Sequence, residues 1–582
     1  MLTTLAAPAF AATWRIEDGD ITVKAGETEG TNKVSQGTNK DVVDTDTIIT
    51  NRDKNTASSH TVTIDAGNNK VKVTLEDVNI MADSGSALTS KGDVTLTLKG
   101  DNHLTGGIGG TGNYGRSGIN SNGSLTITGG ENDSLTAQGG SGRSGGSGIY
   151  SDSLTISGGT VNANGGSSSE DGISDGGYGI HSGSLTISGS TVNATGGNSS
   201  NYKASSGGSG INIFSGGSGS INISDGTLTA TGGNGVNSHG GNGISSSGSL
   251  TISNGGSLTV SGGTVNANGG KSGSGDHSAG GSGISSSGSL TISGSTVKAT
   301  GGDSGNGNYS AGGNGISSSG SITISGGTVD AKGGNSGTGD YSNGGSGIYN
   351  GGRSGSITIS GGTVNAAGGN DGNGNYSYGG SGIHSVSGSI DLSGSLELTA
   401  KAGKGNRSNG MALSQNGYEL DPNTFKEKLD PGAKVTTTDA NGVTKQVTGS
   451  VKPKPPVTPV EPEGPVIPEE SSSSSDGGSS APSASVSSLP GLTVTDKDGQ
   501  RISYTSTQSG NTLTVCVGRF TASFRISLAT LRQLRAEGIE TIAFQTVLCS
   551  TTLSVDELLA MGGEDAEAVL THRFTDSSLT VG

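Results

Sequence analysis

The sequence predicts an all-β protein: a right-handed parallel β-helix, followed by a small α+β module behind a proline- and serine-rich linker. One phrase, most regular as GSGISSSGSLTISGSTVKATGG at residues 281–302, recurs about nine times between residues 106 and 400. Most copies are 30 to 35 residues apart, and repetition at such a period is typical of solenoids. Within each copy, apolar residues alternate with small polar ones, which is the period of a strand and excludes a helical repeat.

Each copy contains three strand-like segments, Gly-Ile, Leu-Thr-Ile and Thr-Val-Asn-Ala, joined by glycines that we expect to form turns. The three segments can wind once around a narrow apolar axis and pair in parallel with the next copy. One step has 40 residues because it holds an additional SLTISNGG-like phrase. The isoleucine of the Gly-Ile step marks the copies at Ile119, Ile149, Ile180, Ile211, Ile244, Ile284, Ile316, Ile348 and Ile383.

The sequence before and after the repeat is expected to close the solenoid. Residues 12–105 keep the strand alternation but carry more charge, so we interpret them as the N-terminal coils and cap, because an exposed sheet edge must be blunted. Residues 401–450 are interpreted as the C-terminal cap. Residues 1–11 are interpreted as the remnant of a signal peptide that lacks its basic region, with an A-x-A cleavage site before Ala12.

The composition changes after the solenoid. Residues 451–488 are rich in proline and then in serine, which is typical of a linker. Residues 489–582 have the pattern of a small α+β module, in which Ser527 caps a helix that ends at Gly538. The only two cysteines, Cys516 and Cys549, form either one disulfide or two buried thiols.

Overall composition excludes several classes of function. With 112 glycines and 28% apolar residues, the chain resembles a disordered protein, but a disordered tract has no reason to keep its apolar residues in phase over nine copies. The formal charge of −16, without basic clusters, argues against nucleic acid as a partner, and no stretch is long enough to insert into a membrane. The seven histidines form no metal motif, and no pair of catalytic carboxylates stands out, so we expect no enzyme.

The loops of four successive copies carry the clearest candidate site. They read GDHSAGG, GNYSAGG, GDYSNGG and GNYSYGG, which places His277, Tyr309, Tyr341 and Tyr376 at equivalent positions. Stacked loops would present a row of rings whose faces can pack against the apolar face of a sugar. The alternative is that the rings stack only on one another and order a glycine-rich loop.

Two further sets of side chains are candidates. The threonines of the Thr-Val-Asn-Ala segments, among them Thr296, Thr328 and Thr363, are expected to form an outward column of hydroxyls that either bonds sugars or only makes a soluble face. Asp276 and Asp340 precede the rings of their loops and supply oxygen ligands of the kind that calcium prefers. Calcium is therefore a possible cofactor, and no other is expected.

The phrase G-x-G-I followed by L-T-I-S-G-G-T-V-N-A-T-G-G resembles secreted bacterial β-helix proteins of the carbohydrate-binding-domain group. The linker and the last module look similar to surface proteins of gut Gram-positive bacteria. This resemblance implies an extracellular, secreted or cell-surface protein whose partner is a polysaccharide or a host glycan, and we expect a monomeric rod. The alternatives are a stalk or adhesin that projects the terminal module, a polysaccharide lyase or hydrolase on the same fold, and an ice-binding face.

Overall fold

A computed structural model gives the structure of the protein. It describes residues 12–109, 113–168, 174–200, 205–214, 218–224, 226–247, 249–254, 263–449, 492–496, 501–502, 504–509, 511–517, 522–546, 550–561, 567–572 and 577–581. The chain divides into two units, the solenoid that ends at residue 449 and the C-terminal module that begins at residue 492, and each is described by itself. The predicted leader at 1–11 and the predicted linker at 451–488 lie outside the described residues.

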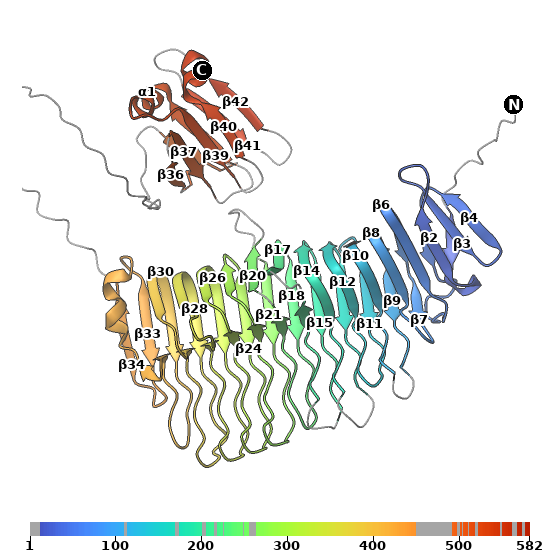
Figure 1. The fold of residues 1–582 in the computed structure, drawn as a ribbon, viewed down its shortest axis with the longest axis horizontal. Coiled ribbons are helices and arrows are strands. Elements are labelled where there is room, and N and C mark those ends of the chain that lie inside the picture. Colours follow the sequence, from blue (N-terminus) through green and yellow to red (C-terminus); the bar gives the residue numbers. More distant parts are fainter. Residues whose placement is uncertain are drawn as a thin grey trace, which may run out of the picture. The chain divides into compact units, whose positions relative to one another are not determined.

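The predicted parallel β-helix is confirmed, and it has about 14 turns. A typical coil consists of β22 (Ile284–Ser286), β23 (Leu290–Ser293) and β24 (Thr296–Thr300), whose residues pair in parallel with those of the next coil (Figure 1). The strands of the repeat are β10 (Ile119–Thr128), β11 (Ser134–Gln138), β12 (Ile149–Ser157), β13 (Thr160–Asn164), β14 (Ile180–Ser188), β15 (Thr191–Thr195), β16 (Ile211–Ile213), β17 (Ser218–Ser224), β18 (Thr227–Thr231), β19 (Ile244–Ser246), β20 (Ser249–Asn254), β21 (Thr264–Asn268), β22 (Ile284–Ser286), β23 (Leu290–Ser293), β24 (Thr296–Thr300), β25 (Ile316–Ser318), β26 (Ile322–Lys332), β27 (Ile348–Asn350), β28 (Ile357–Ala367), β29 (Ile383–Ser385) and β30 (Ile390–Lys401).

The apolar residues of the repeat form columns along the axis. Ile187 pairs with Ile156 on one side and with Ile223 on the other, and all three are buried. A second column continues through Val161 and Val192 in the same way. Because the register advances by one whole copy per coil, each inward residue meets its own equivalent above and below, and a core one coil wide is sufficient. Most of the additional phrase in the 40-residue step falls on residues 255–262, outside the described part of the chain.

The N-terminal cap folds a β-meander over the first coils. Its elements are β1 (Thr13–Arg15), the 3₁₀ helix η1 (Ile16–Asp18), β2 (Ile21–Ala25), β3 (Asn32–Gln36), β4 (Asn39–Asp44) and β5 (Ile48–Thr50), followed by the coil strands β6 (Val62–Glu76), β7 (Asn79–Met81), β8 (Leu88–Lys99) and β9 (Asp101–Thr105). Strands β2, β3 and β4 are antiparallel, whereas β2 joins the solenoid by pairing in parallel with β6. The indole Nε1 of Trp14 donates to the buried carboxylate Oδ2 of Asp44 at 2.8 Å and joins β1 to the end of β4.

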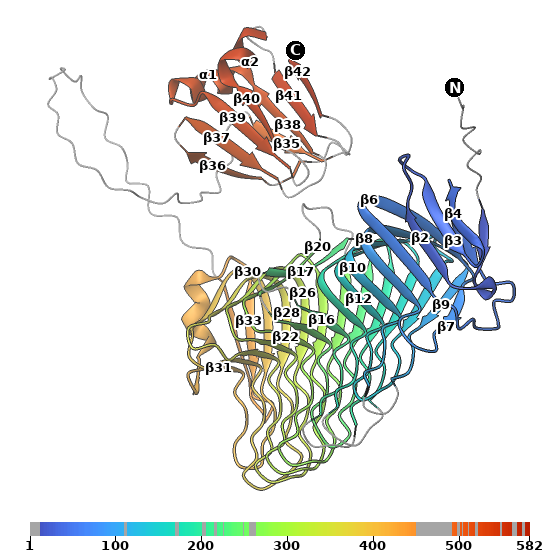
Figure 2. The same ribbon diagram turned by 45° about the vertical axis from the view of Figure 1, so that its right-hand side comes forward.

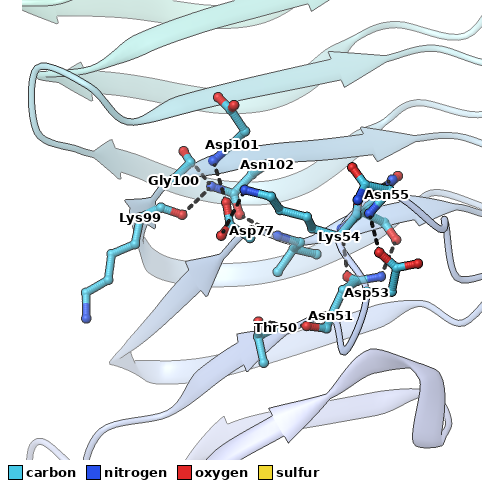
Figure 3. Close-up of polar contacts among 12 residues, drawn as sticks. Thr50, Asn51, Asp53, Lys54, Asn55, Asp77, Lys99, Gly100, Asp101 and Asn102 are labelled. Carbon is cyan, nitrogen blue, oxygen red and sulfur yellow. Dashed lines mark hydrogen bonds and ion pairs between the residues drawn. The ribbon is translucent and has the colours of Figure 1, made fainter.

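Two buried asparagines shape the corners of these first coils (Figure 3). The Oδ1 atom of Asn102 accepts from the backbone N–H of Val78 at 3.0 Å, and its Nδ2 donates to the backbone oxygen of Lys99 at 3.2 Å. The Oδ1 atom of Asn51 accepts from the backbone N–H of Asn79 at 2.7 Å, and its Nδ2 donates to the backbone oxygen of the same residue at 3.1 Å. Since buried backbone groups need partners, the two side-chain oxygens satisfy the backbone N–H groups of Val78 and Asn79 at these corners.

The C-terminal cap closes the other end. It comprises β31 (Leu413–Gln415), β32 (Tyr418–Glu419), the 3₁₀ helix η2 (Pro422–Lys428), β33 (Lys434–Thr438) and β34 (Thr444–Thr448). Strand β33 pairs in parallel with β30, and β34 then turns back antiparallel to β33. Phe425 and Leu429 are buried against the apolar column and remove its open end from water.

The glycine pairs do more than form the expected turns. In most coils of the repeat the sequence has one Gly-Gly pair after the last strand and a second before the next Gly-Ile step, such as residues 301–302 and 312–313. The segment between the two pairs runs out in a loop (Figures 1 and 2). The N–H of Gly302 on an outgoing leg donates to the oxygen of Gly281 on the preceding return leg, and the oxygen of Gly302 accepts from Gly313 on its own return leg, each at 2.8 Å. This zigzag of backbone hydrogen bonds, here called the glycine ladder, runs unbroken through Gly140, Gly146, Gly166, Gly177, Gly197, Gly208, Gly233, Gly241, Gly270, Gly281, Gly302, Gly313, Gly334, Gly345, Gly369, Gly380, Gly403 and Gly410.

Steric contact explains why these positions are glycine. A Cβ atom built on Gly302 would lie 2.0 Å from the backbone oxygen of Gly270, and one on Gly313 would lie 2.0 Å from that of Gly281. Both separations are far below van der Waals contact. Gly270 and Gly302 lie on successive outgoing legs, and Gly281 and Gly313 lie on successive return legs. Each leg therefore packs backbone to backbone against the same leg of the preceding coil, and a methyl group has no room between them.

The C-terminal module is α+β, as the sequence predicts. Its elements are β35 (Leu492–Thr495), β36 (Thr505–Ser509), β37 (Thr512–Cys516), β38 (Ala522–Ser527), α1 (Leu528–Ala536), β39 (Thr541–Gln545), β40 (Ser550–Ser554), α2 (Val555–Met561), β41 (Glu567–His572) and β42 (Ser577–Val581). The strands form two four-stranded sheets around one core. The side chain of Ser527 accepts from the backbone N–H of Thr530 at 3.2 Å, which confirms the predicted cap of α1, and Gly538 ends that helix with φ of +91°.

The glycine ladder makes a first prediction about stability. Gly302→Ala should lower the free energy of unfolding by about 1–3 kcal/mol, the usual cost of overpacking, because the backbone of two coils must move apart. Urea-induced unfolding of the full chain, followed by circular dichroism, measures this loss.

Gly361→Ala is the matched control. A Cβ at Gly361 would have its nearest neighbour at 3.7 Å, which is ordinary contact. Equal effects of the two substitutions would contradict the steric role of the ladder.

Candidate functional site

The ring-bearing loops stack as the sequence predicts. The ring centroids of His277 and Tyr309 are 4.9 Å apart, those of Tyr309 and Tyr341 are 4.9 Å apart, and those of Tyr341 and Tyr376 are 5.0 Å apart. The angles between the ring planes are 7°, 6° and 11°. The spacing is close to the distance between neighbouring strands, so each ring keeps the period of the coils below it.

The backbone beneath this ring stack is held by a second row of hydrogen bonds. The side-chain Oδ1 of Asp276 accepts from the backbone N–H of Asn308, Oδ1 of Asn308 accepts from that of Asp340, and Oδ1 of Asp340 accepts from that of Asn375, each at 2.9 Å. We call these four residues the Asp/Asn row. Each ring residue follows a member of the row and has a positive φ, from +56° to +62°. Because positive φ is unfavourable for bulky side chains, the row is needed to hold it.

The stacking changes which part of each ring a ligand can reach. Tyr309 and Tyr341 have a ring on either side, so they cannot offer a whole face to a sugar, as one of the two sequence interpretations required. The side chains are nevertheless well exposed, at 53% for Tyr309, 43% for Tyr341 and 51% for Tyr376. A ligand that lies along the stack would therefore contact ring edges and phenol hydroxyls.

The two aspartates proposed as calcium ligands belong to the Asp/Asn row. Each carboxylate already accepts one backbone hydrogen bond, and each has an amide side chain as its neighbour along the row. Across the described residues, no group of three or more His, Cys, Asp or Glu side chains is placed to hold a metal ion. Only Asp276 and Asp340, two coils apart, offer carboxylates in the row, and the structure does not bring them together in one coordination sphere.

The ring stack ends at an arginine. The guanidinium carbon of Arg407 lies 5.3 Å from the ring centroid of Tyr376 and 5.7 Å from that of Tyr378, within the range of a cation–π interaction. Tyr378 is 41% exposed, and its equivalents in the three preceding coils are Ala279, Ala311 and Asn343. Sequence reasoning noted GNYSYGG but missed this cluster, because Arg407 lies in the C-terminal cap, outside the repeat.

The threonine columns are in register, as predicted. Thr296 lies opposite Thr328 in the strand register, and Thr328 lies opposite Thr363. In the preceding coil the column continues with Thr264. Thr296 and Thr328 are exposed, whereas Thr363 is half-buried. In the neighbouring outward column, Asn193 Nδ2 donates to Asn162 Oδ1 at 2.9 Å, so part of this face bonds to itself. Further along that column Lys298 lies opposite Asp330 in the strand register, so two residues of opposite charge stand at positions that hold asparagine in other coils.

A second aromatic cluster was not predicted. The ring of His181 meets those of Tyr150 and Phe214 edge-on, with centroid distances of 5.3 Å and 4.7 Å. The centroid of the Tyr178 ring is also 4.7 Å from that of His181. Tyr150 and His181 follow the isoleucine of the Gly-Ile step, where several other copies have Ser or Asn. These departures from the repeat were the available signal. Burial lowers the pKa of His181 to about 4 and raises that of Tyr178, the latter with a smaller contribution from Asp175.

The two cysteines cannot be compared in the structure, because Cys549 lies outside the described residues. The Sγ atom of Cys516 lies 3.5 Å from Oε1 of Gln545, and partial burial raises the pKa of the Cys516 thiol. The alternatives of a disulfide and two thiols therefore stay open.

Comparison of the chain with protein-family models, curated proteins and solved structures found no match. The resemblance to secreted carbohydrate-binding β-helix proteins thus stays a prediction from the repeat motif. Among the described helices, none has the length and apolar character needed to cross a bilayer.

The alternation of acid and amide in the Asp/Asn row makes a second prediction. Asn308→Asp would place three carboxylates in successive coils and should destabilise the solenoid by about 0.2–1 kcal/mol for each adjacent pair of like charges. The loss should shrink at high salt, because screening weakens the repulsion between the carboxylates. Chemical unfolding at pH 7 in low and high salt tests this. Asp276→Asn, which removes a charge from the same row, should cause no such loss, and a salt-independent effect of Asn308→Asp would contradict the electrostatic explanation.

The lowered pKa of His181 makes a third prediction, about pH. An unfolded histidine titrates near pH 6.5, whereas folded His181 titrates at about 4. Between these values the unfolded chain binds a proton that the folded chain excludes, so the free energy of unfolding should fall as the pH is lowered from about 6.5 toward 4. His181→Asn introduces the residue found at the equivalent positions Asn120 and Asn212 and should flatten this dependence. Unfolding midpoints at pH 7 and pH 5 measure it, and parallel pH profiles for the two proteins would refute it.

Proposed function

We propose that the protein is a non-catalytic, extracellular carbohydrate-binding β-helix that holds a glycan along the ring stack of its loops. The observation that carries this proposal is the ring stack itself. Exposed tyrosines are placed at a constant spacing by a backbone that the Asp/Asn row and the glycine ladder hold in place. Such rigidity lowers the entropic cost of binding, and a polymer of identical units matches a surface of identical units.

The chemistry of the exposed atoms also favours a carbohydrate. Phenol hydroxyls both donate and accept hydrogen bonds, and the ring edges beside them are weakly polar, which suits a ligand covered with hydroxyl groups. The outward column that contains Thr296, Thr328 and Thr363 adds a second ordered row of hydroxyls to the same coils.

A stalk or adhesin is the second candidate, and two observations favour it. The rings already stack on one another, and this stacking is sufficient to order a glycine-rich loop without a ligand. In addition, the solenoid and the C-terminal module are separate units of one chain. A stalk needs no ligand on its side, so the two candidates differ in a measurable way.

The fourth prediction separates them. A glycan array that includes pectic, cellulosic and mucin glycans, probed with the full chain, should identify a ligand. The combined variant Tyr309→Phe, Tyr341→Phe, Tyr376→Phe keeps the stack but removes three hydroxyls. Each lost hydrogen bond should weaken binding by about 0.5–1.5 kcal/mol, or roughly two- to tenfold.

Tyr418→Phe is the control, because this tyrosine is 76% exposed and lies outside the ring stack, in the C-terminal cap. Silence across the array would favour the stalk. Binding that is unchanged by the three substitutions would place the glycan elsewhere on the rod.

A further inference from the structure

The three tyrosines of the ring stack are close enough to react with one another. The ring centroids of Tyr309 and Tyr341 are 4.9 Å apart at an interplanar angle of 6°, and those of Tyr341 and Tyr376 are 5.0 Å apart at 11°. Because these nearly parallel rings follow equivalent backbone positions in successive coils, equivalent carbon atoms of neighbouring rings are separated by about the same distance as the centroids. The stack therefore keeps the carbons ortho to each phenol hydroxyl beside their counterparts in the next coil.

These tyrosines are also accessible to an oxidant from solution. Each of the three is at least 43% exposed. Between residues 263 and 410 the sequence contains no cysteine, methionine or tryptophan, so no sulfur or indole of these coils competes for the oxidant. Tyr378 is exposed as well, but it has Asn343 and Ser408 at the equivalent positions of the neighbouring coils and therefore lacks a tyrosine beside it there.

We propose that the ring stack is a site of oxidative cross-linking, at which a one-electron oxidant such as a haem peroxidase joins neighbouring tyrosines as dityrosine. Each of two neighbouring phenols loses one electron and its hydroxyl proton, and the two phenoxyl radicals form a carbon–carbon bond between their ortho positions. The hydrogen on each bonded carbon then moves as a proton, through water, to the phenol oxygen. The two electrons and two protons that are released reduce one molecule of hydrogen peroxide to two molecules of water.

The repeat limits which pairs can form. The Asp/Asn row holds the loop backbone, so the rings approach one another through side-chain torsions, which change readily in exposed residues. Tyr309 and Tyr376 are two coils apart with Tyr341 between them, so within the stack each can couple only with Tyr341. A bond between coils would restrict the unfolded chain as a disulfide does, and the cross-linked solenoid should resist unfolding better.

The test treats the full chain with a haem peroxidase and hydrogen peroxide, then measures dityrosine by its fluorescence and cross-linked peptides by mass spectrometry. We expect peptides in which Tyr341 is joined to Tyr309 or to Tyr376 with the loss of two hydrogen atoms. The yield per molecule should not change with protein concentration, because the reaction is intramolecular. The oxidised protein should also unfold at a higher urea concentration than the untreated protein.

Tyr341→Phe and Tyr309→Phe are matched variants, because each removes one hydroxyl and keeps a ring in the stack. Phenylalanine cannot form a phenoxyl radical, so Tyr341→Phe should abolish cross-linking within the stack, whereas Tyr309→Phe should retain the product that joins Tyr341 and Tyr376. Tyr418→Phe removes a tyrosine that is 76% exposed and lies outside the stack, and it should leave the yield unchanged. Circular dichroism should show all variants folded as the wild type.

Three results would overturn the inference. They are a wild-type yield of dityrosine in Tyr341→Phe, products that join separate molecules, and a reaction of Tyr418 as extensive as that of the stack. The inference does not rest on glycan binding, so silence across the glycan array would refute the proposed function without changing any of these outcomes.

Discussion

The backbone hydrogen bond between one glycine and another is the interaction on which the rest of the solenoid depends. The glycine ladder joins the outgoing and returning legs of successive loops from Gly140 to Gly410. Its glycines have no room for a Cβ, because one built on Gly302 would lie 2.0 Å from the backbone oxygen of Gly270 in the preceding coil. Loops of this length ordinarily have to be ordered by apolar side chains, and this sequence has few to spare. Backbone pairing orders them instead, which explains how a chain with 28% apolar residues remains folded far from its narrow core.

The ladder also determines what the loops can present. Once the legs repeat with the spacing of the coils, each loop residue becomes one member of a row. A ring is then placed over a ring, and an amide beside a backbone N–H of the next coil. Like charges at equivalent positions of successive coils would repel one another. Aspartate and asparagine accordingly alternate along the row from Asp276 to Asn375. The same repetition that builds the exposed row of rings therefore limits the side chains that the loops can carry.

Much of this architecture could be predicted from the sequence, and the failures have a common cause. Alternating Leu, Ile and Val predicted the three strands of each coil and the columns of Ile187 and Val192, because strand period and burial are local properties. The sequence also predicted that His277 and the three tyrosines lie in a row. It left open how the rings face, since that depends on the positive φ which the Asp/Asn row supports. Gly-Gly was interpreted as a turn because nothing in one copy shows that its partner lies in another.

Contacts outside the repeat were the least predictable. The pairing of Arg407 with Tyr376 and Tyr378 joins the cap to the last ring-bearing loop, and the cluster around His181 joins three coils through residues that each break the consensus. In a repetitive rod, most of the surface is the same in every coil and can recognise only a repeating ligand. Positions that depart from the repeat are therefore where a particular ligand can be distinguished from others, or where one end of a polymer can be fixed. Tyr378 and Arg407 depart from the repeat in this way, because among the described residues their ring and charge occur at one end of the ring stack only.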